Sequence, residues 1–347
     1  MVNDYEDEAR RAYHGLEPIL KFNLAKTDFS PIIQWYDYPL EVSQVKKSKS
    51  GKANAFTRGR LAKESQRRQR KQSRQRAQRR RPTIWRMPDG LWKKLKSLLP
   101  PEKAPRTVGR PRVPYRVVCN GILYVLRTGC QWKAVPTEFG SGSTCHKRFQ
   151  EWVALGIFES LWVKQLESYD RRRGIAWCWQ SADSKAVPAP LGGADTGPNP
   201  TDRAKSGSKR HLLVDGRGAP LAAVTTGANV TDMKTNPAVL DGIVVERPEP
   251  TSTQPQHLCE DKGYDYPECR QQAEERGYIP HIPHKGTDPS DIPAKQKRHP
   301  ARRWKVERTH SWNNAFRKLR VRWEKKTENW DALWHLANAL TVFRMTF

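Results

Sequence analysis

The sequence has no long apolar stretch. Nowhere in its 347 residues do about 18 or more apolar residues follow one another, as a transmembrane helix would require. Its first residues, MVNDYEDEAR, also lack the basic segment and the apolar segment that make up a secretory signal. These two absences predict a cytoplasmic protein that does not span a membrane.

Paired cysteines are also missing. None of the six cysteines belongs to a C-x-x-C pair, so a structural zinc site is not expected. Cys145 and His146 are adjacent and could begin such a site. Free thiols in a reducing compartment are the more common explanation for isolated cysteines.

Acidic residues are few relative to basic ones. The chain has 36 Asp and Glu against 63 Lys and Arg, which gives a net charge of +27 and a pI near 10.1. Such a surplus favours a polyanionic partner, because Lys and Arg release condensed counterions when they neutralise phosphates. Nucleic acid, the ribosome and an anionic membrane surface all fit this charge. The length allows two domains and a tail.

The positive charge is concentrated in one segment. Residues 1–45 are mildly acidic and suggest no function, whereas residues 46–81 contain sixteen Lys or Arg and a single acid, Glu64. The sequence QRRQRKQSRQRAQRRR in this segment offers almost nothing to bury. We therefore expect residues 46–86 to form a flexible basic arm that grips phosphate without sequence specificity.

Residues 87–165 have helical periodicity and are expected to form a small all-α domain. The expected helices are Asp89–Leu99, Val117–Arg127 and one that begins after Ser143. Lys147 and Arg148 face outward on the third of these helices. Two helices joined by a short glycine-containing connection are compatible with a helix-turn-helix that reads a DNA groove, and equally with an ordinary helical bundle.

Residues 174–347 alternate strand and helix patterns, which predicts a mixed α/β domain with helices on both faces of a sheet. A strand over residues 175–182 precedes a loop without regular structure over residues 188–209. The further expected elements are a hairpin around residues 215–218, helices 232–243, 267–275, 301–323 and 329–343, a strand ending at residue 261 and a short strand at 277–283.

Three carboxylates in this second domain suggest a metal site. Asp183 and Asp261 each follow an expected strand, and functional groups gather at strand ends in such sheets. Glu307 is the one acid among eight Lys or Arg between residues 302 and 322. Three oxygen ligands suit Mg²⁺ or Mn²⁺, and two such ions support in-line phosphoryl transfer. Singly, each acid could instead be a cap, a turn residue or the partner of Arg303 in a surface ion pair.

Five stretches of the sequence resemble a known family. They are GRPRVPYRVVCNGILYVLRTGCQWKAVP (109–136), ADSK (182–185), SKRHLLVDGRGAPLAAVTTGAN (208–229), EDKGYD (260–265) and RRWKVERTHSWNNAFRKLRVRWEK (302–325). Together they resemble bacterial insertion-sequence transposases of the DDE type, in the IS-five family of the wider IS-four/IS-five group. The resemblance covers residues 87–347, and the first stretch resembles the helical DNA-binding region of that family.

The resemblance implies a fold, a site and an activity. The fold is an RNase H-like catalytic domain, with a mixed sheet flanked by helices. Asp183, Asp261 and Glu307 match the catalytic triad of the family and would hold two Mg²⁺ or Mn²⁺ ions. The implied activity is binding of terminal inverted repeats in double-stranded DNA, followed by strand cleavage and strand transfer, by a homodimer on the bacterial nucleoid. An RNase H-like nuclease without strand transfer and a DNA-binding protein without catalysis are the alternatives.

Several basic and aromatic side chains are candidate DNA contacts. They are Lys147, Arg148, Lys209, Arg210, Arg303, Trp304, Arg308 and Lys318. The related group often has a Tyr and a Lys around its glutamate, but Pro300 and Asn314 occupy those positions here. Lys318 is expected on the same helix face as Glu307, where it could replace the missing Lys.

Overall fold

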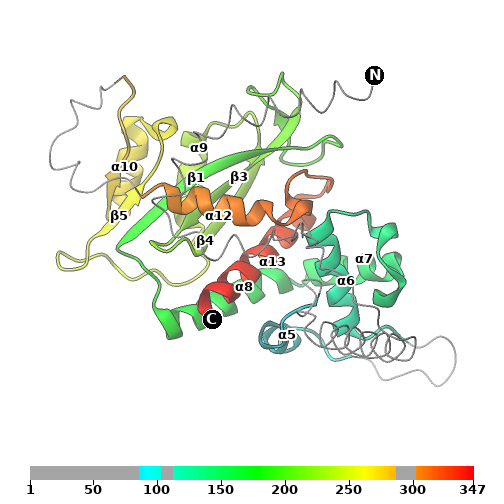
Figure 1. Cartoon of the computed structure of the whole chain (residues 1–347). Helices are drawn as coiled ribbons and strands as arrows, with labels where there is room; N and C mark the ends of the chain where they lie inside the picture. Colours follow the sequence, from blue (N-terminus) through cyan, green and yellow to red (C-terminus); the bar gives the residue numbers. More distant parts are fainter. Residues whose placement is uncertain (1–85, 103–111, 287–301) are drawn as a thin grey trace, which may run out of the picture. The chain divides into compact units, whose positions relative to one another are not determined.

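We describe a computed structural model of the chain, covering residues 86–102, 112–286 and 302–347 (Figure 1). The predicted N-terminal segment, 1–45, and the predicted basic arm lie outside the described residues, apart from Arg86 at the end of the arm. Pro300, named above as a departure from the family pattern, lies outside them as well.

The centre of the fold is a six-stranded mixed sheet. Its strands are β1 (Trp179–Pro188), β2 (Gly197–Pro198), β3 (Ser206–Val214), β4 (Pro220–Gly227), β5 (Gln256–Cys259) and β6 (Tyr278–His281). Strand β3 pairs antiparallel with β1, β2 and β4, whereas β5 runs parallel to β1 and to β6. An antiparallel meander followed by two parallel strands is the RNase H arrangement. The predicted RNase H-like fold is therefore confirmed.

The predicted hairpin joins β3 to β4. The Asp215 N–H donates to the Ala219 carbonyl at 3.0 Å, and the Asp215 carboxylate accepts the N–H groups of Arg217 (2.9 Å) and Ala219 (2.7 Å). Gly218 has a φ of 91°, which an L side chain rarely adopts. Asp215 is fully buried and serves to close this turn.

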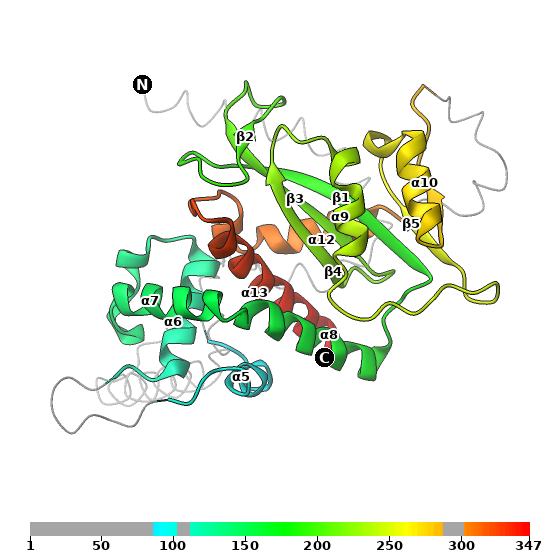
Figure 2. The ribbon, with the colours of Figure 1, turned by 180° about the vertical axis from the view of Figure 1, so that it is seen from behind.

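Helices cover both faces of the sheet, as predicted. Successive strand residues point to opposite faces. Leu212 and Val214 join the core formed with α12 (Trp304–Asn314) and α13 (Thr327–Thr346). Leu213, between them, joins the core formed with α9 (Asp232–Asp241) and α10 (Pro267–Glu275). Figure 1 shows α12 crossing β1 and β3, and Figure 2 shows α9 on the other face.

Within the described residues, four helices precede the sheet. They are α5 (Asp89–Lys96), α6 (Tyr115–Thr128), α7 (Gly142–Ala154) and α8 (Ile157–Arg173). Helix α6 ends at Gly129, whose φ is 70°. The cap of α7 is Ser141, which accepts the Thr144 N–H at 3.1 Å, so the prediction of Ser143 was wrong.

The connection between α6 and α7 differs from the expected short turn. It runs from Gly129 to Ser141 and includes two 3-10 turns, η1 (Trp132–Ala134) and η2 (Thr137–Phe139). A helix-turn-helix has a turn of about 3–4 residues. The longer connection packs its own side chains, since Trp132 lies 5.1 Å from the Phe149 ring of α7.

Helix α8 was not expected from the sequence. It passes through the predicted boundary at residue 165 and packs along α13. Trp162 Nε1 donates to the Pro220 carbonyl at 3.1 Å, and Gln165 Nε2 donates to Thr346 Oγ1 at 3.0 Å. One core cluster therefore includes side chains of α6, α8, α13 and the sheet. No helix within the described ranges combines the length and the apolar character needed to cross a bilayer.

The ends of several other elements also differ from the prediction. Strand β1 continues to Pro188, because its pairing with β3 extends from Ser181 to Pro188. The expected loop over residues 188–209 contains β2 and the start of β3. The helix expected over residues 301–323 ends at Asn314. The backbone then leaves the helical conformation, the Phe316 side chain is buried, and the 3-10 turn η5 (Arg317–Leu319) follows.

A buried arginine fixes the loop between β1 and β3. Arg322 is 1% exposed and makes five hydrogen bonds. Two of them go to the carbonyls of Ala194 (2.6 Å) and Asp195 (3.0 Å) in the loop, and one goes to Ser208 Oγ (2.8 Å) at the start of β3. This side chain therefore positions the loop beside the C-terminal part of the chain.

Candidate active site

Asp183 lies inside strand β1, and the prediction that it ends the strand was wrong. Ser181 Oγ donates to the Arg302 carbonyl at 3.3 Å, so Ser181 points to the face that α12 covers. Asp183, two residues further, points to the same face. Its Oδ1 accepts the N–H of Ser184 at 2.8 Å.

Asp261 follows strand β5, as predicted, and caps the 3-10 turn η3 (Lys262–Tyr264). Its Oδ1 accepts the Gly263 N–H at 2.6 Å. The parallel register pairs Ser181 with Cys259. Asp183 and Asp261 each lie two residues beyond that pair, so the parallel register places them beside each other just past the end of β5.

Glu307 lies in the first turn of α12, the helix packed against β1 and β3. Its side chain is 51% exposed, and its Oε1 lies 2.8 Å from Arg303 Nη2. In the structure the carboxylate is therefore oriented by Arg303, one turn earlier on the helix. The ion pair between Glu307 and Arg303, expected above as an alternative to metal binding, is therefore formed in the structure.

The three carboxylates affect one another electrostatically. Burial, together with the negative charges of Asp261 and Glu307, raises the pKa of Asp183 to about 6. The Ser184 N–H and the Arg303 guanidinium act in the opposite direction on this pKa. The structure thus brings together Asp183, Asp261 and Glu307 from three separate elements.

The residues present fit a divalent cation. All three donors are carboxylate oxygens, the ligands preferred by Mg²⁺ and Mn²⁺. A cation would also offset the repulsion that raises the pKa of Asp183. In this conformation, no group of three or more His, Cys, Asp or Glu side chains among the described residues is close enough to hold a metal ion together.

Glu260 is a fourth acid beside the site that the sequence reasoning did not select. It is fully buried, and neither of its carboxylate oxygens has a hydrogen-bond partner. Burial, together with the charge of Asp261, raises its pKa to about 8, so it is protonated at neutral pH. Its position next to Asp261 was visible in the sequence, but its burial was not.

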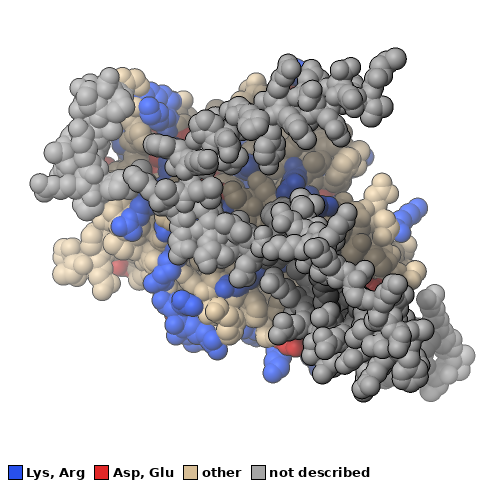
Figure 3. All heavy atoms as spheres, viewed as in Figure 1, with Lys and Arg blue, Asp and Glu red and all other residues tan. Residues whose placement is uncertain are grey.

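Five of the predicted DNA-contact residues have side chains at least partly exposed. Lys147 is exposed on α7, whereas Arg148 beside it pairs with Glu151. Trp304 is 49% exposed, with Lys305 Nζ 3.8 Å and Arg308 Cζ 4.9 Å from the ring centre. Arg303 is 33% exposed. Figure 3 shows Lys and Arg side chains at several places on this face of the molecule.

The other three are turned away from solvent. Lys209 Nζ lies 3.0 Å from Asp232 Oδ1 with 17% of its side chain exposed. Arg210 is fully buried, and its Nη2 donates to Asn314 Oδ1 at 2.8 Å. Lys318 Nζ lies 2.9 Å from Glu324 Oε1 with 5% of its side chain exposed. Lys318 also lies in η5, so the expectation that it shares a helix face with Glu307 was wrong.

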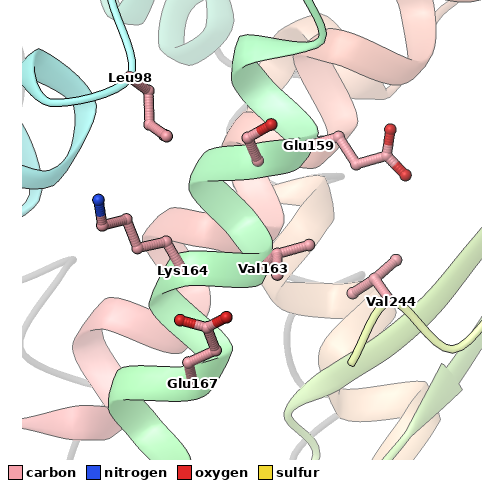
Figure 4. A pocket seen from close by; sticks show the side chains of 7 residues that line it. Leu98, Glu159, Val163, Lys164, Glu167 and Val244 are labelled. Atoms are coloured by element: carbon pink, nitrogen blue, oxygen red, sulfur yellow. The ribbon is translucent and has the colours of Figure 1, made fainter. Parts of the chain in front are cut away.

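An open pocket of about 470 Å³ lies elsewhere on the molecule, along α8 (Figure 4). The lining residues are Leu98, Glu159, Ser160, Val163, Lys164, Glu167 and Val244. None of them is among the predicted site residues.

Comparison with known proteins identifies similar sequences for both parts of the chain. A family model of IS4/5 transposases matches residues 87–162, and a model of the transposase DDE domain matches residues 180–342. The chain is 40% identical over 136 residues to a transposase named for insertion sequence element IS402 of Burkholderia cepacia. That match covers 38% of this chain and 61% of the relative, so the chain spans less than two thirds of it.

Two further similarities complete the comparison. The uncharacterized 16.2 kDa protein of insertion element IS402, also from Burkholderia cepacia, is 34% identical over 116 residues, which cover 32% of this chain and 79% of that protein. Among solved structures, the catalytic domain of Mos1 mariner transposase matches 58% of this chain and 94% of its own length, with 10% identity and a TM-score of 0.24.

Proposed function

Because the chain belongs to the IS4/IS5 group of insertion-sequence DDE transposases, we propose that it cuts DNA at the ends of a mobile element and joins those ends to a target. The observation that carries the proposal is that Asp183, Asp261 and Glu307 lie on neighbouring elements of the RNase H-like fold, and that the charges of the last two act on the Asp183 carboxyl. The reaction is phosphoryl transfer on double-stranded DNA. It would take place on the bacterial nucleoid, in the cytoplasm.

Each residue of the triad lies on a different element of the fold. Asp183 is held by the central strand, Asp261 by the turn after β5, and Glu307 by α12. The three carboxylates would hold two Mg²⁺ or Mn²⁺ ions. When bound, such ions supply activation of the attacking hydroxyl and stabilisation of the leaving oxygen. Without them the three negative charges would repel the DNA backbone.

Basic residues around the triad would hold the DNA. Arg303 and Arg308 lie on α12 beside Glu307, and the exposed Lys147 lies on α7. Contacts of this kind position a duplex without reading its sequence. We assign terminal-repeat recognition to the helical region, residues 87–165, together with the basic arm. Joining two ends in one reaction favours a homodimer on DNA.

Substitution of one triad aspartate separates binding from chemistry. Asp261→Asn removes a charge and keeps the size of the side chain, so the protein should still shift terminal-repeat DNA on a gel but should not cleave it with Mg²⁺. Asp241→Asn is a matched control, because Asp241 pairs with Arg276 at the surface, 2.6 Å away. Cleavage by the Asp261→Asn protein would contradict the proposal.

A second measurement distinguishes a transposase from a simple nuclease. Labelled precut ends are incubated with supercoiled target DNA and Mg²⁺, and joined products are resolved on a gel. Joining of the 3′ ends is the expected result. Cleavage without joining would assign the protein to RNase H-like nucleases that lack strand transfer.

A further inference from the structure

Asp232 lies behind the active site, at the start of α9, and its side chain has a dense set of partners. Its Oδ1 accepts hydrogen bonds from Ser184 Oγ at 2.9 Å and Lys209 Nζ at 3.0 Å. His211 Nδ1 lies 3.8 Å from the same oxygen. Lys209 is itself fixed by a second hydrogen bond, to the Val230 carbonyl at 2.8 Å. A carboxylate used only to begin a helix would not require these contacts from two strands.

One of those partners links Asp232 to the first triad residue. Ser184 follows Asp183 on β1, and its side chain points to the face opposite that of Asp183. Its hydroxyl is held by Asp232, while its backbone N–H donates to Asp183 Oδ1 at 2.8 Å. Ser184 therefore connects the Asp232 carboxylate to the Asp183 carboxylate through the strand.

The other oxygen of Asp232 faces the turn that holds the second triad residue. A Cβ atom added at Gly263 would lie 3.8 Å from Asp232 Oδ2 and 2.7 Å from Asp261 Oδ1. The Gly263 N–H is also the group that orients Asp261, with a hydrogen bond of 2.6 Å. Asp232 Oδ2 and Asp261 Oδ1 thus both border the space that a side chain at Gly263 would fill.

We propose that Asp232 is a positioning residue that fixes the Asp183 carboxylate through Ser184 and limits movement of the turn that carries Asp261. Asp232 does not contact substrate in this role. Lys209, predicted above as a DNA contact, holds Asp232 in place instead. The inference rests on the proposed function, because it treats Asp183 and Asp261 as the groups whose placement matters.

The test measures ion binding directly, without turnover. Mn²⁺ is titrated into the full-length protein by calorimetry in the absence of DNA, and Mg²⁺ is titrated separately in the cleavage assay. Asp232→Ala and Ser184→Ala are each expected to weaken Mn²⁺ binding about tenfold, as loss of an outer partner of a ligand does. The Mg²⁺ concentration for half-maximal cleavage should rise by a similar factor, while DNA binding stays unchanged.

A double variant tests whether Ser184 links Asp232 to Asp183. When two residues act through the same contacts, the effects of their substitutions on binding do not add up. Combined with Ser184→Ala, Asp232→Ala should weaken Mn²⁺ binding far less than it does alone. Asp232→Asn keeps an oxygen acceptor for Ser184 and should retain most of the ion affinity. Should Asp232→Ala fail to fold, Ser184→Ala and Asp232→Asn still test the link.

Controls separate this inference from the proposed function. Asp241→Ala, at the other end of the same helix, should bind Mn²⁺ as the unsubstituted protein does, and Asp183→Asn should lose most of that binding. Unchanged ion binding in Asp183→Asn would overturn the proposed site itself. The positioning role alone would be overturned if Asp183→Asn lost Mn²⁺ binding while Ser184→Ala and Asp232→Ala kept it. Fully additive effects of Ser184→Ala and Asp232→Ala on Mn²⁺ binding would also overturn only that role.

Discussion

Arg303 and Glu307 lie one turn apart on α12 and form an ion pair, with Arg303 Nη2 2.8 Å from Glu307 Oε1. The same guanidinium lowers the pKa of Asp183, which burial otherwise raises. Arg303 therefore acts on two of the three triad carboxylates. Its positive charge opposes a cation that would bind between them, although the same charge favours an approaching phosphate.

Replacing Arg303 should tighten ion binding and weaken DNA binding. In Arg303→Gln, Glu307 is released from a partly exposed pair, and such pairs stabilise by about 0.2–1 kcal/mol. We expect Mn²⁺ affinity to rise about twofold to fivefold, given that RT is about 0.6 kcal/mol. Affinity for a short terminal-repeat duplex should fall at the same time. Calorimetry and gel shift measure the two effects.

Arg303→Lys is the control for charge without the planar guanidinium group. It keeps a cation beside Glu307, so its Mn²⁺ affinity should remain close to that of the unsubstituted protein. If Arg303→Gln bound Mn²⁺ more weakly, Arg303 would be supporting the ligand arrangement instead of competing with the ion.

A partly buried carboxyl outside the triad, that of Asp331, predicts how stability changes with pH. Burial raises the pKa of Asp331 to about 6, although Thr225 Oγ1 donates to its Oδ1 at 2.6 Å. Because the folded-state pKa exceeds the unfolded one, its contribution to stability is present below about pH 4 and lost as the pH rises through about 6. Asp331→Asn should therefore stabilise the protein at pH 8 by on the order of 3 kcal/mol.

Urea unfolding of the metal-free protein at several pH values measures this effect. The gain in Asp331→Asn should shrink as the pH falls toward 4, where the original carboxyl is itself neutral. Asp241→Asn should show no such gain, because its ion pair with Arg276 lowers the pKa of Asp241. A gain independent of pH would show that the carboxyl charge is not its cause.

Much of the catalytic part could be read from sequence because its signals are local. The Asp215 turn, the helix Pro267–Glu275 and the acid after β5 each occupy a few adjacent residues. Helix α8 was missed, because its apolar positions face several neighbours and give little one-sided pattern. The extension of β1 beyond Asp183 was missed as well, since it depends on pairing with β3, which is a tertiary contact.

The basic residues were the hardest to assign from sequence. Charge alone does not separate a cation that faces DNA from one that faces a buried carboxylate. Lys209 pairs with Asp232, which is distant in the sequence. Lys318 pairs with Glu324, which belongs to no pattern that would mark it as a partner. Arg210 is buried without a carboxylate hydrogen-bond partner and donates to Asn314. That contact also gives a structural reason for the Asn at position 314.

Lys318 should act on stability and have little effect on DNA affinity. Its side chain and that of Glu324 are 5% and 8% exposed. Removing one partner of a buried pair leaves an uncompensated charge and costs about 3–5 kcal/mol. Lys318→Met should therefore lower stability in urea by about that amount. Lys318→Met/Glu324→Leu should recover most of the loss, and a loss in the double variant equal to that of Lys318→Met would contradict this account.

Salt dependence of DNA binding can separate the exposed cations from the buried ones. Lys147 is exposed on α7, and Lys209 is held by Asp232 with 17% of its side chain exposed. Each phosphate contact contributes about 0.9 to the slope of log K against log salt concentration on duplex DNA. Lys147→Met should thus reduce the magnitude of that slope by about one and weaken binding to all duplexes alike. Lys209→Met should leave the slope unchanged, since its ammonium group is already paired. A smaller slope for Lys209→Met would mean that Lys209 exchanges Asp232 for a phosphate when DNA binds.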